Sequence, residues 1–262
     1  VIFTYEGLPW EKLLNYKIKE YNSKIQTYGY FFSVVSEFHN SPFIKFNSKY
    51  EPDIILSSGF FAKKKFLKNG FKKNKIINIG LSKKKKIATK IEKRNLIKKN
   101  CLLIPEAFEE EILNLVNFSL KVLKKNNKIN FVLRLHPSTE PKLLNKIKSY
   151  LIDKKIKLST ASLEKDLNKS NMVLYRGSST VIKAVKENLL PVYVPIKDEL
   201  SIDPLFDIRK HKPEINSPDD FILLYDNFNK NKFKRPNKNI NRIKKFCDEY
   251  LSDIHQKNIS KI

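Results

Sequence analysis

Arginine is scarce in this basic chain of 262 residues, because only six of its 52 lysine and arginine residues are arginine. Proteins that read nucleic acids use arginine freely, since its planar guanidinium fits phosphates and guanine edges. The net charge of +25 is therefore read mainly as solvated lysine surface, and no nucleic-acid partner is expected. A lysine-rich surface also favours peripheral contact with an anionic membrane.

Cysteine and long apolar runs are scarce as well. Cys101 and Cys247 are too few for a disulfide framework or a metal cluster. No stretch approaches the roughly eighteen uninterrupted apolar residues of a membrane span, and no signal peptide is visible. The chain opens on Val1 inside a strand-like run, so we expect that the natural N-terminus is missing. The expected location is cytoplasmic, with peripheral contact at the inner face of the membrane as an option.

Short apolar runs alternate with helical patterns along the chain, which predicts an α/β fold with parallel sheets. The first part predicts strands at 1–5, 24–32, 53–59 and 75–80, with helices at 9–22 and 60–70. The second part predicts strands at 101–105, 129–137, 155–160 and 172–175, with helices at 106–126, 140–154 and 162–170. A helix follows the turn at 176–179, a further strand closes at Pro195, and two more helices follow after about residue 215.

A basic, weakly periodic stretch at 81–100 is the best linker candidate. We therefore expect two Rossmann-like domains: a partial N-terminal domain, residues 1–90, and a C-terminal domain with closing helices, residues 91–262. The first is shorter than an ordinary domain of this type, and we expect it to be truncated.

Two polar motifs follow predicted strands of the second domain. In the first, Arg134 and His136 are predicted to share one strand face, and Pro137 ends the strand. His136 could also be an ordinary loop residue. Because ligands bind outside the carboxyl ends of parallel strands, this motif is a candidate for contact with a ligand.

The second motif is the turn Arg176-Gly177-Ser178-Ser179-Thr180, which joins an apolar strand to a helical pattern. Gly177 would let the backbone approach a ligand, and either serine would cap the helix, whose free N–H groups attract anions. A serine pair before a helix is also a normal N-cap that needs no ligand. Arg176 and His136 at two carboxyl ends together predict a phosphate site.

A third motif is Thr4-Tyr5-Glu6-Gly7 with Trp10 and Glu11 behind it. Glu11 is interpreted as compensating the helix dipole, and Trp10 as a core residue. Glu6 has no such structural explanation, and partial burial would raise its pKa and suit it to act as a general base.

The Glu-Gly turn with Pro-Trp-Glu, together with "YGYFF", "EPDIILSSGFFAKKKFLKNGF" and "INIG", resembles bacterial surface-carbohydrate biosynthesis proteins. The His-Pro and Ser-Ser-Thr motifs are similar to those of sialyltransferases, polysialyltransferases and Kdo transferases with the two-domain GT-B fold. The resemblance covers roughly residues 1 to 200. One departure is Tyr5 before Glu6, where that group has a second acid.

The resemblance implies a glycosyltransferase that moves a sugar from a CMP-activated donor onto a surface polysaccharide or lipid-linked glycan. It assigns the donor phosphate to His136, Ser178 and Ser179, and the base toward the acceptor hydroxyl to Glu6. Trp10 and Glu11 would lie on the acceptor side. No metal or other cofactor is expected, because a nucleoside monophosphate can leave without one and the chain has no Asp-x-Asp motif.

Three alternatives stay open. The chain could be a non-catalytic protein of a carbohydrate cluster that keeps the phosphate cradle, which a buried salt bridge from Glu6 to a lysine would support. It could be a glycerophosphate-polymer transferase, which also uses a CMP-linked donor. A nucleic-acid-binding protein would instead gather lysines and exposed aromatic residues on one face.

Overall fold

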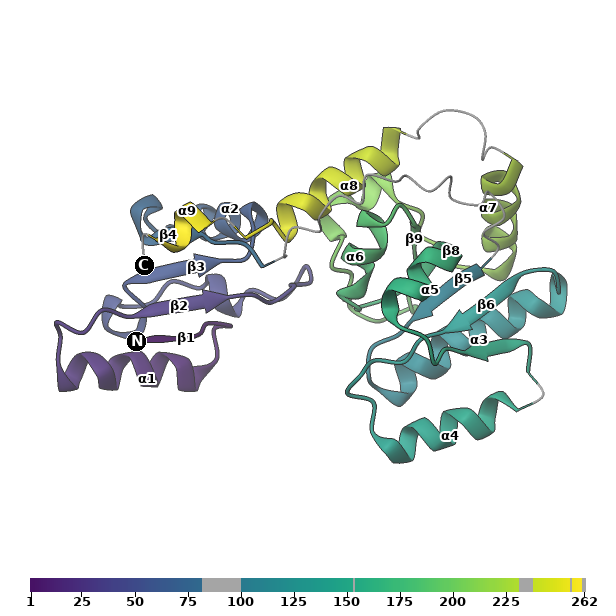
Figure 1. The fold of residues 1–262 in the computed structure, drawn as a ribbon, viewed down its shortest axis with the longest axis horizontal. Helices are drawn as coiled ribbons and strands as arrows, with labels where there is room; N and C mark the ends of the chain where they lie inside the picture. The colour runs from purple at the N-terminus through teal and green to yellow at the C-terminus, as the bar shows by residue number, and fades with distance from the viewer. Residues whose placement is uncertain (82–99, 153, 231–237, 255, 261–262) are drawn as a thin grey trace. The chain divides into compact units, whose positions relative to one another are not determined.

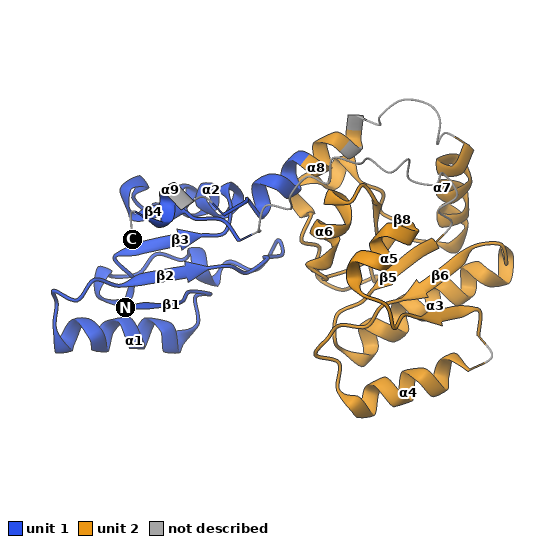
Figure 2. Cartoon of the chain, in the orientation of Figure 1, with its two compact units in different colours: residues 1–90, 245–262 blue, residues 91–244 orange. Residues whose placement is uncertain are grey.

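The structure is a computed structural model, and it describes residues 1–81, 100–152, 154–230, 238–254 and 256–260. The chain divides into two compact units (Figures 1 and 2). Unit 1 holds residues 1–90 and 245–262, and unit 2 holds residues 91–244. The C-terminal segment 245–262 therefore belongs to the first unit, which corrects its expected place in the second domain. The predicted linker falls almost entirely outside the described residues.

Unit 1 is built on a four-stranded parallel sheet in the order β1-β2-β3-β4. Its strands are β1 (Ile2–Thr4), β2 (Tyr28–Phe31), β3 (Ile54–Ser57) and β4 (Ile76–Asn78), and its helices include α1 (Pro9–Tyr21), α2 (Phe60–Lys68) and α9 (Gln256–Ile259). Helix α1 lies at the β1 edge of the sheet (Figure 1). Pro9 begins α1, as expected from its fixed φ.

Phenylalanines fill the core of unit 1. Phe66 of α2 is fully buried, with its ring centroid 4.7 Å from that of Phe43, 5.5 Å from Phe31 and 5.1 Å from Phe71. Edge-to-face and tilted pairs of this kind add to the stabilisation from apolar burial. The core of unit 1 also contains the buried aliphatic residues Ile55, Leu56 and Ile76 of its sheet.

The C-terminal segment packs on unit 1 through Tyr250. Its ring stacks on Phe61 at 4.3 Å, and its hydroxyl both donates to the Val35 carbonyl and accepts from the Val35 amide, each at 2.8 Å. A side chain at Gly59 would place Cβ 2.2 Å from the Tyr250 carbonyl oxygen. These buried contacts join residues far apart in sequence, which is why a linear reading of the chain misplaces the segment.

Unit 2 has a five-stranded parallel sheet in the order β7-β6-β5-β8-β9. Its strands are β5 (Asn100–Ile104), β6 (Asn130–Leu133), β7 (Ile156–Leu158), β8 (Ser170–Tyr175) and β9 (Leu190–Tyr193), and its helices include α3 (Glu109–Lys125), α4 (Pro141–Leu151), α5 (Leu163–Lys169), α6 (Thr180–Lys186) and α7 (Pro218–Lys230). Helix α8 (Lys238–Tyr250) contributes its last residues to unit 1.

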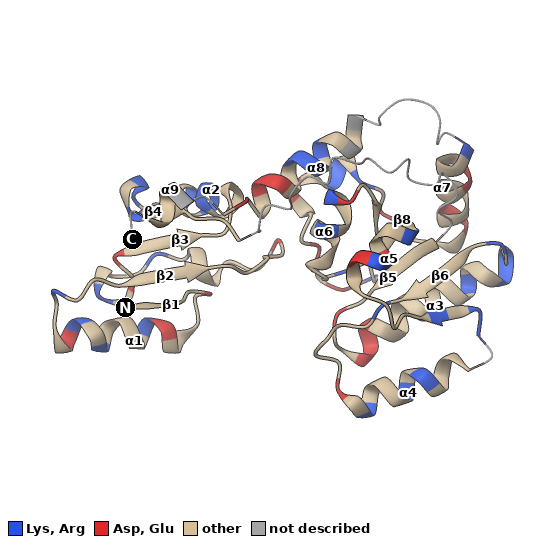
Figure 3. Cartoon of the chain, in the orientation of Figure 1, with Lys and Arg blue, Asp and Glu red and all other residues tan. Residues whose placement is uncertain are grey.

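The order of the strands reverses between β5 and β8, which makes their carboxyl ends a topological switch point. All residues of β8 are buried, as expected for a central parallel strand covered on both faces. The predicted α/β class with parallel sheets is confirmed. Lysine and arginine residues are spread over many elements of both units (Figure 3). None of the helices in the described residues has the length and apolar character that crossing a bilayer needs.

Candidate functional site

Three polar segments follow adjacent strands at the carboxyl edge of the unit 2 sheet. Glu106 follows the central strand β5, His136 follows β6, and Gly177 follows β8. A Cβ atom on Gly177 would lie 3.1 Å from Oε1 of Glu106, so these two residues are in direct contact. Burial raises the pKa of Glu106, and the nearby His136 partly opposes that rise. The sheet therefore brings a carboxylate, an imidazole and a glycine turn together.

His136 lies three residues beyond the end of β6, because the strand ends at Leu133 and not at the predicted Pro137. The His136 side chain is exposed, in a turn that the Thr139 amide closes on the His136 carbonyl. The Ser138 amide donates to Nδ1 at 3.2 Å, and the Ser138 hydroxyl lies 2.6 Å from the same nitrogen. With Nδ1 accepting, the neutral ring carries its proton on Nε2, which can donate to a phosphate.

Arg134 does not share a strand face with His136, which corrects the sequence-based expectation. Its Nη1 donates to the Ala161 carbonyl and to Asp166, each at 2.8 Å. Asp166 is buried on α5, so the pair fastens that helix to the sheet. We therefore reinterpret Arg134 as a structural cation rather than a phosphate ligand.

The guanidinium of Arg176 also pairs with carboxylates of the protein. The side chain is only 1% exposed, with Nη1 2.5 Å from Glu111 on α3 and Nη2 2.9 Å from Glu199 after β9. Burial raises the pKa of Glu111, although Arg176 opposes the effect. The predicted contact between Arg176 and a donor phosphate is corrected: the guanidinium links α3 to the loop after β9.

The serine pair keeps the place that the sequence predicts. Ser179 occupies the N-cap position before α6, but its hydroxyl makes no capping hydrogen bond, which corrects that expectation. Backbone carbonyls of Ser178 and Ser179 close the first turn onto Val181 and Ile182. The Ser179 hydroxyl is exposed and is not used by the helix. Thr180 begins α6, and Pro137 is exposed beside His136.

The surroundings of Gly177 leave little room for a side chain, and its backbone φ does not call for glycine. A side chain there would place Cβ 2.9 Å from Ile202 Cδ1 as well as against Glu106. Sequence reasoning missed Glu106, because it placed this residue in the first turn of a helix beginning at 106. The helix begins at Glu109, and the signal that could have found Glu106 was a carboxylate directly after a buried strand.

In unit 1, Glu11 organises the turn that follows β1. It is fully buried and accepts hydrogen bonds from the Glu6 amide at 2.8 Å, the Leu8 amide at 2.9 Å and the Thr4 hydroxyl at 3.1 Å. Its role is thus more specific than compensation of the helix dipole. Gly7 in this turn has φ of +80°, a conformation that favours glycine.

Glu6 is partly buried in the same turn. Burial raises its pKa, and the charge of Glu11 raises it further. No hydrogen bond or ion pair joins the Glu6 carboxylate to another described residue. Trp10 is 53% exposed, so its interpretation as a core residue is wrong. Among the described residues, no three His, Cys, Asp or Glu side chains gather as a metal site.

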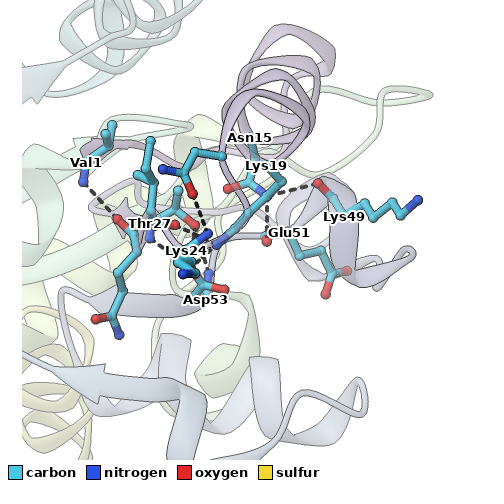
Figure 4. Close-up of polar contacts among 11 residues, drawn as sticks. Val1, Asn15, Lys19, Lys24, Thr27, Lys49, Glu51 and Asp53 are labelled. Carbon is cyan, nitrogen blue, oxygen red and sulfur yellow. Dashed lines mark hydrogen bonds and ion pairs between the residues drawn. The ribbon is translucent and has the colours of Figure 1, made fainter.

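A polar cluster fixes α1, and with it the turn between β1 and α1 (Figure 4). Asn15 donates to the backbone carbonyls of Lys49 and Glu51, at 3.0 and 2.7 Å. One turn further, Lys19 donates to Asp53 at 2.5 Å, and Asp53 also accepts from the amide and hydroxyl of Thr27. Helix α1 is therefore held to the segments that lead into β2 and β3.

The sequence matches no protein-family model and no curated protein. Solved structures match the fold instead. S. aureus TarM superposes with a TM-score of 0.51 and 16% identity, over 92% of this chain and 50% of TarM. The pneumococcal O-GlcNAc transferase GtfA, in complex with UDP and GlcNAc, gives a TM-score of 0.53 and 12% identity over 95% of this chain and 53% of GtfA.

A Listeria monocytogenes protein assigned as a UDP-N-acetylglucosamine 2-epimerase gives a TM-score of 0.53 and 14% identity, over 97% of this chain and 77% of that one. The chain spans about half the length of TarM and GtfA. At these identities the likeness concerns the fold. The chain has the two-domain α/β fold of GT-B glycosyltransferases, as its motifs lead us to expect.

Proposed function

We propose that the chain is a glycosyltransferase that binds a nucleotide-sugar at the carboxyl edge of unit 2. The observation that carries the proposal is the gathering of Glu106, His136 and the Ser178-Ser179 turn at the switch point of a GT-B sheet. Open α/β sheets bind ligands at this place. Partners are a nucleotide-sugar donor and a glycan acceptor.

The donor phosphate is assigned to the turn before α6. Free backbone N–H groups and the hydroxyls of Ser178, Ser179 and Thr180 would donate to its oxygens. His136 would donate from Nε2 to the same phosphate. Glu106 would repel a phosphate and is assigned to hydroxyl groups of the ribose or the sugar, which donate to a carboxylate.

In the transfer step, the acceptor oxygen bonds to the anomeric carbon as the bond between that carbon and the phosphate oxygen breaks. Glu6 accepts the proton of the acceptor hydroxyl. His136 and the amides at the start of α6 stabilise the charge that develops on the departing phosphate. Each role belongs to a residue of this chain, and none requires Arg134 or Arg176.

The identity of the donor nucleotide is tested by binding. The motif resemblance favours CMP-activated sialic acid or Kdo, whereas GtfA was solved with UDP. Binding of CMP, UDP and GDP by calorimetry tests the site. We expect one nucleotide to bind selectively, and His136→Ala to weaken it at least about tenfold while His39→Ala in unit 1 leaves it unchanged. Absence of binding by all three would end the proposal.

An epimerase is the second candidate, because the Listeria protein shares the fold over 97% of this chain. Incubation with UDP-N-acetylglucosamine separates the two: an epimerase forms a second nucleotide-sugar without any acceptor, and a transferase does not. A non-catalytic role is less favoured, since no salt bridge joins Glu6 to a lysine among the described residues. A glycerophosphate-polymer transferase would bind CMP at the same turn.

A further inference from the structure

Unit 1 contains a pocket of about 500 Å³ between the start of α1 and the segment 41–50. This volume lies within the roughly 300 to 1,000 Å³ of small-molecule sites. The pocket is lined by Gly7, Pro9, Lys12, Leu13, Ser41, Ile44, Phe46 and Tyr50. Pro9, Lys12 and Leu13 share one face of α1, so a single helix face forms one wall.

Apolar side chains of this pocket face solvent. Leu13 is 56% exposed, Ile44 52% and Phe46 50%, and Tyr50 is also exposed. A contiguous exposed apolar patch marks a binding surface more often than a random surface feature does. The lining therefore favours a ligand with an apolar chain or ring.

One cation lies within this apolar lining. The Lys12 ammonium sits 3.5 Å from the centre of the Phe46 ring, and no hydrogen bond or ion pair joins it to another described residue. Partial burial lowers its pKa, although Glu51 and Glu11 act in the opposite direction. Both carboxylates already accept backbone N–H groups, from Phe46 and from Glu6 and Leu8. The pocket thus offers a partly desolvated positive charge to a ligand.

The pocket adjoins the residue to which we assign proton transfer. Gly7 forms part of its lining and directly follows Glu6. The Ser41 hydroxyl donates to the Gly7 carbonyl at 2.7 Å, which holds the pocket wall to the turn of Glu6. A ligand seated here would have its remaining part close to the Glu6 turn.

We propose that this pocket binds an amphiphilic anion, in which an apolar chain or ring carries a phosphate or carboxylate, and that this group is part of the acceptor. The apolar part packs on Leu13, Ile44 and Phe46, and the anion pairs with Lys12. The inference rests on the proposed function, since it names the class of acceptor whose hydroxyl Glu6 deprotonates.

Octyl phosphate, used below its micelle concentration, tests the pocket. Trp10 is the one tryptophan of the chain and neighbours Pro9, so its fluorescence reports binding in unit 1. We expect saturable binding of octyl phosphate, and binding of octyl glucoside and of inorganic phosphate that is at least about tenfold weaker. Octanoate is measured alongside, to rank a carboxylate against a phosphate. Lys12→Met should weaken octyl phosphate binding at least about tenfold.

The matched control is Lys17→Met on the same helix. Lys17 is exposed and pairs with Glu20 at 2.6 Å, so this variant should bind octyl phosphate normally. The proposal would be overturned by an equal loss of octyl phosphate binding in both variants, or by octyl glucoside binding as tightly as octyl phosphate. Association with anionic vesicles without saturable binding of octyl phosphate would overturn it as well. Nucleotide binding in unit 2 is measured separately, so loss of the acceptor proposal and loss of the donor site are distinguishable.

Discussion

The amide of Glu6 donates a hydrogen bond to the buried carboxylate of Glu11, and the charge of Glu11 raises the pKa of the Glu6 carboxyl. One acid thus positions the backbone of the other and tunes its ionisation. Burial of Glu6 acts in the same direction and is the larger effect. Glu6 and Glu11 lie five residues apart in the sequence, but the turn buries Glu11 fully and Glu6 only partly.

We predict that Glu6→Gln lowers kcat by about two to four orders of magnitude, the usual contribution of a general base. Nucleotide binding should be unchanged. Because the pKa of Glu6 is raised, the acidic limb of the kcat/KM profile should lie above the value of about 4.3 typical of glutamate. Glu20→Gln, at an exposed position on α1, is the control. An unchanged rate in Glu6→Gln would remove Glu6 from the mechanism.

Arg176→Met tests the corrected role of this arginine. The substitution leaves Glu111 without its buried partner, so we expect a loss of about 3 to 5 kcal/mol of stability in unit 2. Adding Glu111→Gln should restore part of that loss, which calorimetric unfolding would show. If Arg176→Met kept full stability but lost nucleotide binding, the sequence-based role as a phosphate ligand would be correct after all.

Tyr250 should fasten the C-terminal segment to unit 1. It is 2% exposed, and we expect Tyr250→Ala to cost about 3 to 5 kcal/mol of the free energy of unfolding. Tyr250→Phe keeps the stack on Phe61 but leaves the Val35 backbone groups unpaired, at a cost of about 1 to 3 kcal/mol. Thermal unfolding followed by Trp10 fluorescence separates the two variants, and no change in either would contradict the packing.

Asp53 should make unit 1 sensitive to acid. Burial opposes its ionisation, but the hydrogen bonds from Lys19 and Thr27 outweigh burial and lower the pKa. This stability is present above the unfolded pKa of about 3.9 and is lost as pH falls through the lower folded value. Asp53 is about a third exposed, so the effect is about 1 kcal/mol. Asp53→Asn should remove this pH dependence, and Asp219→Asn, in an exposed pair, should keep it.

Local pattern was enough to place most strands and helices. The apolar run before Arg176 is β8, Pro9 begins α1, and the hydroxyl of Ser162, the first residue of the predicted helix 162–170, caps α5 on the Lys165 amide. These features depend on neighbours within a few residues, so the sequence alone carries them. The ends of several elements were misjudged, as at Leu133, where the ladder with β5 and β7 stops, and at Glu109, where α3 begins.

Partner choice among charged side chains was decided by the tertiary structure. Arg134 and Arg176 stand at strand ends, where sequence suggests a phosphate, but the fold brings Asp166, Glu111 and Glu199 to them. Those acids lie 23 to 65 residues away, and only the packing of α3, α5 and the loop after β9 sets their distances.

The amino-acid sequence by itself determined the α/β class, the parallel strands and the place of the His136 and Ser178-Ser179 turns, because hydrophobic period and turn residues act locally. Tertiary structure alone placed Glu106 against Gly177, assigned residues 245–262 to unit 1 and left the Lys12 ammonium without a hydrogen bond or ion pair to another described residue. Those outcomes depend on which segments pack together, and burial then decides which charges pair and which remain available to a ligand.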